Sequence, residues 1–158
     1  GSHETFEMLK RPDTVQIVPT VGDRVLVSFE EQPNRPEPFY TPFGGRIDAG
    51  EEPLTAAKRE LLEEAGMISD DWELWFTSQP TGKIEWLIYF FIARNCKKIQ
   101  AQTLDPGERI TVKEVLFEEF LEIALRNDFR GRELTMEFMK MKLEPGRLEE
   151  FKKRIFQK

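Results

Sequence analysis

The segment from Gly45 to Met67 constrains this chain more than any other part of it, because it fits one long pattern throughout. It reads GRIDAGEEPLTAAKRELLEEAGM and matches G-x5-E-x7-R-E-U-x-E-E-x-G-U at every position, where U is an aliphatic residue. The seven fixed residues of such a pattern coincide by chance less than about once in a million frames. An ordinary solvated helix with a charged face is the alternative, and this coincidence argues against it.

Within this segment the sequence predicts a helix from Pro53 to Gly66, because Pro suits a first turn and Gly suits a C-terminal end. Apolar residues recur at a spacing that places them on one stripe against a core. They are Leu54, Ala57, Leu61 and Ala65. Glu60, Glu63 and Glu64 fall off this stripe and, by their spacing, form one patch of carboxylates.

The residues around this helix suit a cation and a phosphate ligand. Gly44, Gly45 and Gly50 allow a backbone path close to a ligand, with a carbonyl turned toward a metal. Glu51 closes this loop, and Arg59 offsets part of the repulsion among the carboxylates. Carboxylates are the ligands that hard cations prefer, and a pyrophosphate resists attack by water until cations neutralise its charge. The segment therefore predicts a magnesium and pyrophosphate site.

The same segment resembles the Nudix box of the Nudix hydrolases, which cleave nucleoside diphosphates linked to another moiety. The resemblance implies a mixed α/β (α+β) fold, an α/β/α sandwich with a mixed central β-sheet. It also implies Mg²⁺ as the cofactor, with Mn²⁺ as a substitute. The expected metal ligands are Glu60, Glu63 and Glu64, together with the carbonyl of Gly44.

Further roles follow from the resemblance for residues beside the ligands. Glu63 and Arg59 are expected to belong to the catalytic machinery, and Arg59 with Glu51 to hold the loop and the helix in place. Arg46, in the same loop, is expected to bind substrate. The chain departs from the family at Phe43, where Pro is common, and this affects the approach to the loop rather than the carboxylates.

Three features outside the box resemble the ADP-ribose and nucleotide-sugar pyrophosphatase branch. In EQPNRP (31–36), Arg35 is expected to meet phosphate, and a solvated loop arginine is the alternative. In SQPTGKIEW (78–86), Pro80 comes earlier than in that branch, and its turn would form with any substrate. In DPGERI (105–110), Glu108 takes the place of the branch's general base. The alternatives are that Glu108 only decorates a surface turn or that a box glutamate is the base.

Aromatic residues offer candidates for stacking on a nucleotide base. Tyr40 and Phe43 precede the box loop and are the best of these candidates, whereas most tryptophans are expected in the core. Along 72–77, strand alternation places Trp75 on the opposite face from Trp72 and Phe76. One of these faces must then meet another layer or a partner subunit.

Composition bounds the class of protein. The 158 residues suit one domain, expected over 4–158, while residues 1–3 look like the scar of an expression tag. A net charge of −6 and a pI near 5.0 argue against a nucleic-acid partner and favour a small phosphorylated substrate. The single Cys96 and the lack of a long apolar run or signal peptide favour a cytoplasmic protein without a membrane partner.

Periodicity and turn residues predict a mixed order of elements. Strands are expected at 14–18, 24–29, 72–77, 84–94 and 109–116, with a hairpin at Gly22-Asp23 and a proline-rich loop at 31–38. After the box helix, further helices are expected at 118–126, 133–142 and 147–156. The last carries an apolar stripe of Leu148, Phe151 and Ile155, which packs on the domain or on a second subunit, so a homodimer is possible.

These observations favour a Mg²⁺-dependent pyrophosphohydrolase that cleaves ADP-ribose or a nucleotide sugar to a nucleoside monophosphate and a sugar phosphate. Members of the resembled branch usually have a longer N-terminal region that helps to hold adenine, whereas here the box begins at Gly45. Hydrolysis of a nucleoside triphosphate or another nucleotide therefore stays open. A nucleotide-binding regulator without activity is a further alternative, which the complete set of acidic box residues disfavours.

Overall fold

The structure is a computed structural model that describes all residues except 1–2 and 158. Gly1 and Ser2, two of the three residues interpreted as a tag scar, therefore lie outside the described residues. The strands are β1 (Leu9–Lys10), β2 (Thr14–Val21), β3 (Arg24–Glu31), β4 (Phe39–Thr41), β5 (Met67–Ile68), β6 (Asp71–Ser78), β7 (Ile84–Glu85), β8 (Ile88–Arg94), β9 (Lys97–Lys98) and β10 (Arg109–Val115). The helices are α1 (Pro53–Ala65), α2 (Phe117–Ala124), α3 (Arg132–Leu143) and α4 (Arg147–Ile155).

The central sheet has the order β10-β3-β2-β8-β6, with β4 paired to the side of β3. Strands β2 and β8 run parallel, in a register that places Thr14 opposite Ile88, whereas the other pairs are antiparallel. The sheet is therefore mixed, as predicted. Two small two-stranded sheets, β1-β7 and β5-β9, lie outside it.

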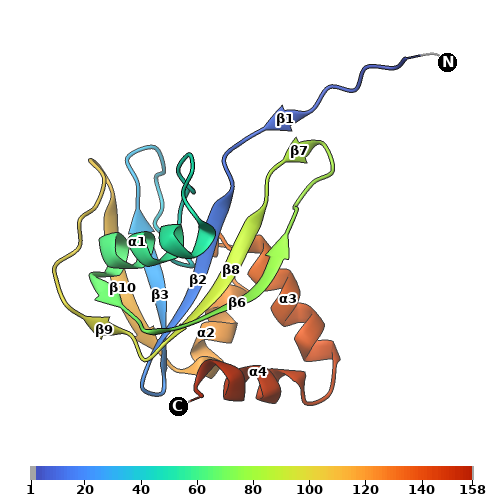
Figure 1. Ribbon diagram of the computed structural model, residues 1–158. Coiled ribbons are helices and arrows are strands. Elements are labelled where there is room, and N and C mark those ends of the chain that lie inside the picture. Colours follow the sequence, from blue (N-terminus) through green and yellow to red (C-terminus); the bar gives the residue numbers. More distant parts are fainter. Residues whose placement is uncertain (1–2, 158) are drawn as a thin grey trace.

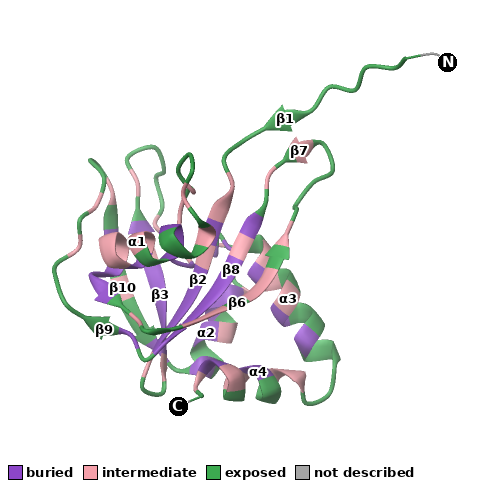
Figure 2. Ribbon diagram, viewed as in Figure 1, coloured by how far each residue is buried: buried purple, intermediate pink, exposed green. Residues whose placement is uncertain are grey.

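The helices cover both faces of this sheet (Figure 1). Helix α1 packs on one face, against residues that include Ile17 of β2 and Phe91 of β8. Helices α2, α3 and α4 pack on the other face, against residues that include Val27 of β3 and Phe90 of β8. Figure 2 shows the buried residues concentrated along the central strands between these helices. This arrangement confirms the α/β/α sandwich.

Most predicted elements are found within a few residues of their expected bounds, and two local differences have a clear cause. The stretch 84–94 is not one strand, because β7 pairs with β1 while β8 pairs with β2, and the chain changes partner between them. Strand β4 was not predicted, since it has only three residues and depends on pairing with β3. The predicted hairpin at Gly22-Asp23 joins β2 to β3, and Gly22 has a positive φ of 57° there.

Strand β6 corrects the prediction for its aromatic side chains. Its register with β8 shifts between Leu74 and Phe76, which is a β-bulge. The extra residue turns Phe76 to the same face as Trp75. The centroids of the two rings lie 4.8 Å apart, in an edge-to-face arrangement. Trp72 packs on the opposite face, so only the expected separation of Trp75 from Trp72 is confirmed.

The C-terminal helix α4 packs on the domain itself. The sequence had left open whether its apolar stripe packs on the domain or on a second subunit. Phe151 and Ile155 of α4 are buried in the core that α2 and α3 share. The Trp75 ring stacks on Phe151, with 4.3 Å between centroids. The Thr20 hydroxyl donates to the Ile155 carbonyl at 3.2 Å and ties the end of α4 to β2. In the described residues, no helix has the length and apolar character that crossing a membrane requires.

Candidate active site

Helix α1 lies close to the sheet because small side chains form its buried face. Ala56, Ala57, Leu61 and Ala65 are all fully buried, and Pro53 stands in the first turn as predicted. Leu54 was expected on this stripe, but 38% of it is exposed, and Ala56 takes its place. The helix ends at Gly66, whose left-handed φ of 66° confirms the predicted glycine cap.

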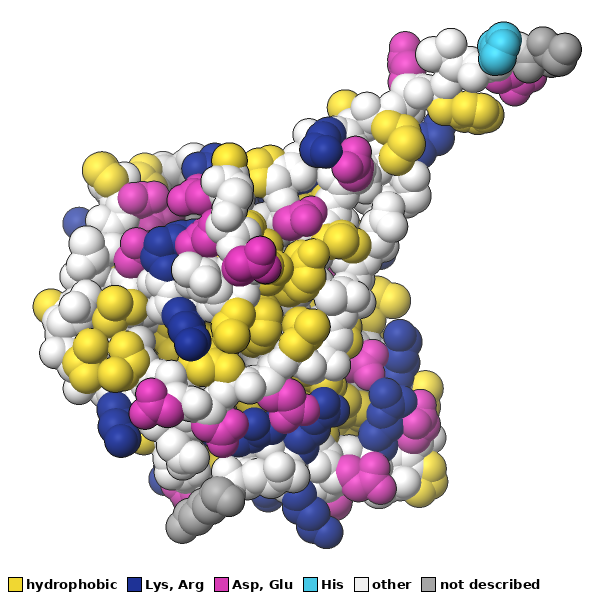
Figure 3. All heavy atoms as spheres, in the orientation of Figure 1, with side chains coloured by type: hydrophobic (Ala, Val, Ile, Leu, Met, Phe, Trp, Pro, Cys, Tyr) yellow, Lys and Arg dark blue, Asp and Glu magenta, His cyan; other side chains and the backbone are white. Residues whose placement is uncertain are grey.

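The opposite side of α1 forms one wall of a cavity of about 630 Å³, called here the box cavity. Its lining comes from three separate parts of the chain: the box loop, α1, and the loop before β10. The lining residues are Gly44, Gly45, Arg46, Asp48, Arg59, Glu60, Glu63, Glu64, Thr103, Leu104, Asp105 and Glu108. Figure 3 shows acidic side chains gathered over α1 and the neighbouring loops. The fold thus brings Glu108 to the same cavity as the box carboxylates.

Arg59 organises the carboxylates of this cavity. It binds Glu51 through two parallel hydrogen bonds, of 3.0 Å from Nε and 2.9 Å from Nη2. Its Nη1 donates to Glu60 at 2.8 Å and to Glu63 at 3.2 Å. The same guanidinium also donates to the Arg46 carbonyl at 2.9 Å, so that Arg59 holds the box loop against α1. These bonds lower the pKa of Glu51 and raise that of Arg59.

The box loop passes so close to its neighbours that Gly44 has no room for a side chain, and a side chain at Gly45 would displace the Glu60 carboxylate. A Cβ on Gly44 would lie 2.0 Å from the Val15 carbonyl oxygen, and the φ of Gly44 is 139°. A Cβ on Gly45 would lie 2.4 Å from Oε1 of Glu60. The Gly44 amide donates to Oε2 of Glu64 at 2.8 Å, which directs this carboxylate toward the loop. The backbone of the box loop therefore lies directly against the carboxylates of Glu60 and Glu64 on α1.

The carboxylates of this region repel one another in a partly dry environment. Removal from water raises the pKa of Glu64 well above its usual range, and repulsion from nearby carboxylates raises it further. These carboxylates are Glu60, Glu30 and Glu108. The hydrogen bond from the Gly44 amide acts in the opposite direction and lowers this pKa. The pKa of Glu60 is also raised, mainly by burial and despite its bond to Arg59. Negative charge in this cluster is only partly compensated by protein groups.

Glu30 is a carboxylate of this region that sequence reasoning missed. It lies in β3, is only 8% exposed, and accepts hydrogen bonds from Ser28 at 3.1 Å and from Gln32 at 3.2 Å. Burial raises its pKa, and the nearby Glu108 raises it further. The available signal was an acidic residue at the end of an apolar strand, just beyond the predicted bound of 29.

The donor set fits a divalent cation by its chemistry. Glu60, Glu63 and Glu64 supply carboxylate oxygens from one helix, the Gly44 carbonyl belongs to the adjacent loop, and excess negative charge surrounds them. Within residues 3–157, no three Asp, Glu, His or Cys side chains converge closely enough to form a ready metal site. Arg59 bonds to Glu60 and Glu63 in this arrangement, so coordination requires these side chains to shift.

A second structural link joins the box helix to the Glu108 loop. The side-chain amide of Gln102 donates to the Glu64 carbonyl and, at 3.0 Å, to the Ile110 carbonyl. The Thr103 amide donates to the Glu63 carbonyl at 2.8 Å. These bonds tie the C-terminal turn of α1 to both ends of the segment that carries Glu108. No local pattern in the sequence marks Gln102 for this role.

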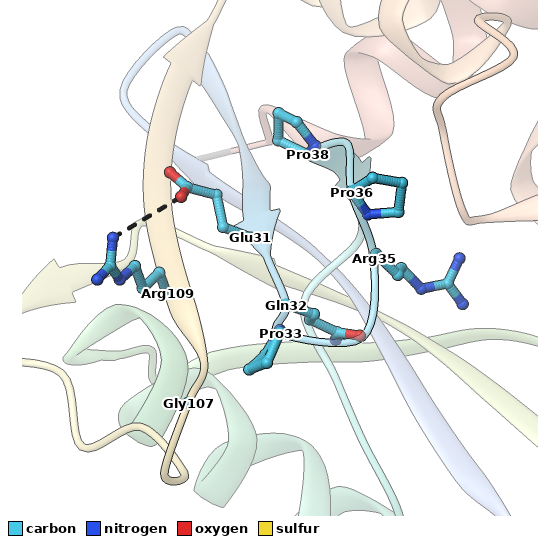
Figure 4. Close-up of a pocket in the computed structure, with 8 residues that line it drawn as sticks. All are labelled: Glu31, Gln32, Pro33, Arg35, Pro36, Pro38, Gly107 and Arg109. Atoms are coloured by element: carbon cyan, nitrogen blue, oxygen red, sulfur yellow. Dashed lines mark ion pairs between the residues drawn. The ribbon is translucent and has the colours of Figure 1, made fainter.

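Arg35 and Pro80 lie outside the box cavity. Arg35 lines a separate cavity of about 350 Å³, formed by the proline-rich loop, Gly107 and Arg109. Figure 4 shows its side chain pointing away from the ion pair between Arg109 and Glu31. The Arg35 guanidinium lies 5.2 Å from the centroid of the Phe39 ring. Pro80 is exposed in the turn between β6 and β7.

The two aromatic candidates also lie elsewhere, which corrects the expectation that they stack on a base beside the box. Phe43 is fully buried in the core beneath α1 and has no free ring face. Its position next to the glycine loop, in a bridge with Ile17 of β2, explains this burial. Tyr40 packs on Phe29, with 4.8 Å between ring centroids, and on the core of the opposite face. Of the residues assigned to substrate, Arg46 alone lines the box cavity.

Comparison with known proteins agrees with this geometry. The model of the NUDIX domain matches residues 10–138. The chain is 27% identical over 126 residues to the methanol dehydrogenase activator of Bacillus methanolicus, which covers 77% of this chain and 68% of that protein. It is 48% identical over 48 residues to the RNA pyrophosphohydrolase of Brucella anthropi, which covers 30% of this chain and 27% of that protein.

Solved structures share the fold. The crystal structure of an ADP compounds hydrolase superposes with a TM-score of 0.70 at 19% identity, covering 85% of this chain and 73% of that chain. At this identity the likeness concerns the fold alone. The family model, in contrast, spans most of the sequence and includes the whole box. The chain therefore belongs to the Nudix family and is a Nudix hydrolase, of the class that acts on phosphorus-containing anhydrides.

Proposed function

We propose that this protein is a Mg²⁺-dependent pyrophosphohydrolase that cleaves the diphosphate of a nucleoside diphosphate derivative, with ADP-ribose or a nucleotide sugar as the first candidates. The observation that supports this most is the box cavity. It gathers Glu108 from the loop before β10 beside Glu60, Glu63 and Glu64 of α1. Such a cavity can hold cations on one wall and present a proton acceptor from another.

In this mechanism Glu60, Glu63 and Glu64 would hold the metal, with the Gly44 carbonyl as a further ligand. A cation held there would neutralise charge on the diphosphate and so make its phosphorus accessible to attack. Before metal binds, Arg59 keeps the carboxylates of Glu60 and Glu63 in place through its hydrogen bonds to them. Since these bonds must shift when metal binds, Arg59 then remains anchored by its paired bonds to Glu51.

Glu108 acts as the general base. Water attacks one phosphorus, its proton passes to the Glu108 carboxylate, and the P–O bond to the bridging oxygen breaks. For ADP-ribose the products are AMP and ribose 5-phosphate. Glu108 suits this role because it stands on a glycine-containing loop across the cavity from α1, and Gln102 and Thr103 hold that loop to the helix. Arg46, in the box loop, is the proposed contact for phosphate oxygens.

The ADP-ribose assignment draws support from the fold shared with the ADP compounds hydrolase. The match to the RNA pyrophosphohydrolase is a short one and carries no substrate assignment to this chain. A small-molecule substrate and a cytoplasmic location are part of the proposal. The buried thiol of Cys96, which hydrogen-bonds to the Ala93 carbonyl, suits a reducing compartment.

A substrate panel with Mg²⁺ tests this function. It contains ADP-ribose, several nucleotide sugars, dinucleotides, nucleoside triphosphates and a 5′-triphosphorylated RNA, and products are identified by chromatography. We expect the fastest turnover on a nucleoside diphosphate derivative, with a nucleoside monophosphate among the products. A preference for triphosphates would refute the assigned substrate class but would remain consistent with the proposed mechanism. Inactivity on every compound, with tight binding of one, would identify a regulator.

The role of Glu108 has its own test. Glu108→Gln should lower kcat by roughly 10²–10⁴-fold, because the amide cannot accept the proton. The affinity for Mg²⁺, measured by calorimetry, should stay nearly the same. Asp105→Asn is the matched control, since Asp105 lines the same cavity from the same loop. An unchanged kcat in Glu108→Gln would remove Glu108 from the mechanism.

A further inference from the structure

A further cavity, of about 650 Å³, lies on the other side of the box loop and is called here the N-terminal cavity. One wall is the segment Lys10, Arg11 and Pro12, and the facing wall is the box loop from Arg46 to Ala49. Arg46 and Asp48 line both this cavity and the box cavity. The two cavities are therefore neighbours that share part of the box loop. The volume is that of an ordinary small-molecule site.

The N-terminal wall of this cavity is held by several independent contacts. Strand β1 pairs with β7, and Lys10 bonds to Glu85 of β7 at 2.8 Å. The Arg11 guanidinium lies over the Trp86 ring, 4.0 Å from its centroid. The face of an indole ring attracts such a cation. Arg11 thus lines this wall with its guanidinium stacked on Trp86.

The box loop is tied to the same segment. The Ile47 amide donates to the Asp13 carbonyl at 2.8 Å, and the Asp13 side chain accepts a bond of 2.7 Å from the Leu87 amide. Thr14 forms an isolated antiparallel bridge with Arg46, whose carbonyl Arg59 holds from the other side. Both walls of the N-terminal cavity are therefore connected to the residues that position the box carboxylates.

The three cations of this cavity differ in how far they are already neutralised. Lys10 forms an ion pair with Glu85, and Arg46 lies 3.6 Å from Asp48. Arg11 forms no ion pair with an acidic residue in residues 3–157, and its contact is the Trp86 ring. The rest of the lining includes Pro12, Ile47 and Ala49, which offer no competing charge. A guanidinium in such a setting matches the geometry of phosphate oxygens.

We propose that the N-terminal cavity binds the moiety on one side of the scissile diphosphate, and that Arg11 recognises a further phosphate carried by that moiety. This inference rests on the proposed function and names its substrate class: a nucleoside diphosphate derivative with an additional phosphate on one half. The diphosphate itself lies at the box carboxylates, Arg46 stands where the ligand crosses the box loop, and Arg11 meets the distal phosphate.

Binding of product-like ligands tests this without any need for turnover. One pair is AMP and adenosine 2′,5′-bisphosphate, and the other is ribose 5-phosphate and ribose 1,5-bisphosphate, so that each pair differs by one phosphate. Calorimetry gives Kd for all four with the full chain. In one of the two pairs, we expect the bisphosphate to bind about tenfold more tightly than the monophosphate, as a charge-assisted hydrogen bond allows. That pair identifies the half that occupies the cavity.

Arg11→Gln should abolish this preference, and Arg11→Lys should keep most of it because the charge remains. Lys153→Gln is the matched control, since it removes one positive charge from an exposed position on α4, away from both cavities. The preference should survive there. A wild-type protein without preference in either pair would overturn the proposal, as would a preference that Arg11→Gln leaves unchanged or that Lys153→Gln also abolishes.

This outcome is separate from that of the substrate panel. Ligands without an anhydride bond report on the N-terminal cavity whether or not the protein is active. If the protein shows the Arg11-dependent preference but hydrolyses no compound of the panel, the proposed site is supported and the proposed function is refuted. If it hydrolyses ADP-ribose but shows no such preference, the proposed function is supported and the proposed site is refuted.

Discussion

Two clusters of charged side chains in this protein are built from the same residue types and behave in opposite ways. The box cluster consists of Glu51, Arg59, Glu60, Glu63 and Glu64. The C-terminal cluster consists of Asp71, Glu73, Arg94 and Arg154. In the first, one guanidinium faces several carboxylates, whereas in the second two guanidiniums face two carboxylates.

This difference in charge balance sets the pKa values. Partial burial opposes ionisation of Glu73, but hydrogen bonds from Arg154 and Arg94 outweigh it and lower the pKa of Glu73. In the box cluster, removal from water dominates and raises the pKa of Glu64. The C-terminal cluster is satisfied by the protein alone and ties α4 to β6 and β8, whereas the box cluster leaves negative charge for a ligand to neutralise.

The largest effect expected from this contrast is on activity. Glu64→Gln keeps the volume and the acceptor for the Gly44 amide but removes one metal ligand charge. Loss of metal-based stabilisation should lower kcat/KM by about 10³-fold or more. The metal-free protein should at the same time keep or gain thermal stability, since a buried repulsion disappears. Glu114→Gln, an exposed carboxylate on β10, is the control. Activity within tenfold of wild type would refute the assignment.

The C-terminal cluster should show the opposite pattern. Arg94 is 5% exposed and bonds to Asp71, Glu73 and the Arg154 carbonyl. Arg94→Met removes the partner of Asp71, one of two partners of Glu73 and the donor to the Arg154 carbonyl, and because both carboxylates are partly exposed it should lower the free energy of unfolding by about 2 kcal/mol. Below the unfolding temperature, kcat/KM should change less than twofold. Urea denaturation and a kinetic assay measure the two effects. The partly exposed Arg24→Met should cost less than about 0.5 kcal/mol, and an equal loss there would contradict the role of the cluster.

A smaller effect should follow from loosening the link between the box helix and the Glu108 loop. Gln102→Ala removes the bonds to the Glu64 and Ile110 carbonyls, so kcat should fall about tenfold, as for a small misplacement of a catalytic group. KM and the affinity for Mg²⁺ should change little. Gln100→Ala, with an exposed side chain in the same segment, should leave kcat unchanged. A fall in stability with an unchanged kcat would reduce Gln102 to a structural role.

The smallest effect concerns pH, and it has opposite signs in the two clusters. The folded pKa of Glu73 lies below the usual value of 4.5, so its stabilisation is present above that value and is lost as pH falls through the folded pKa. The folded pKa of Glu64 lies well above 4.5, so its contribution is present below that value and is lost as pH rises through the folded pKa.

Thermal unfolding across pH, without metal, separates these two contributions. Glu73→Gln should flatten the loss of stability on the acid side of 4.5, and Glu64→Gln should flatten the loss above it. Saturating Mg²⁺ should abolish the second slope and leave the first. Identical pH profiles for wild type and Glu64→Gln would show that the carboxylate carries no excess repulsion.

Local signals predicted most helices and strands because their causes are local. The Gly66 cap, the turn at Gly22 and the start of α1 at Pro53 depend on residues next to them. The bulge in β6 and the break between β7 and β8 depend on partner strands, and a strict alternation along one chain contains no information about either. The buried stripe of α1 also depends on how the helix sits on the sheet, so Ala56 is buried where Leu54 was expected.

The sequence by itself determined that Glu60, Glu63 and Glu64 share one patch, because helical spacing alone places them there. Only the tertiary structure decided what surrounds that patch. Glu108, Glu30 and Arg46 reach it, while Phe43 enters the core and Arg35 lies at another cavity. The physical reason is that desolvation and charge repulsion act through space, between segments whose proximity is set by the packing of the sheet and its loops.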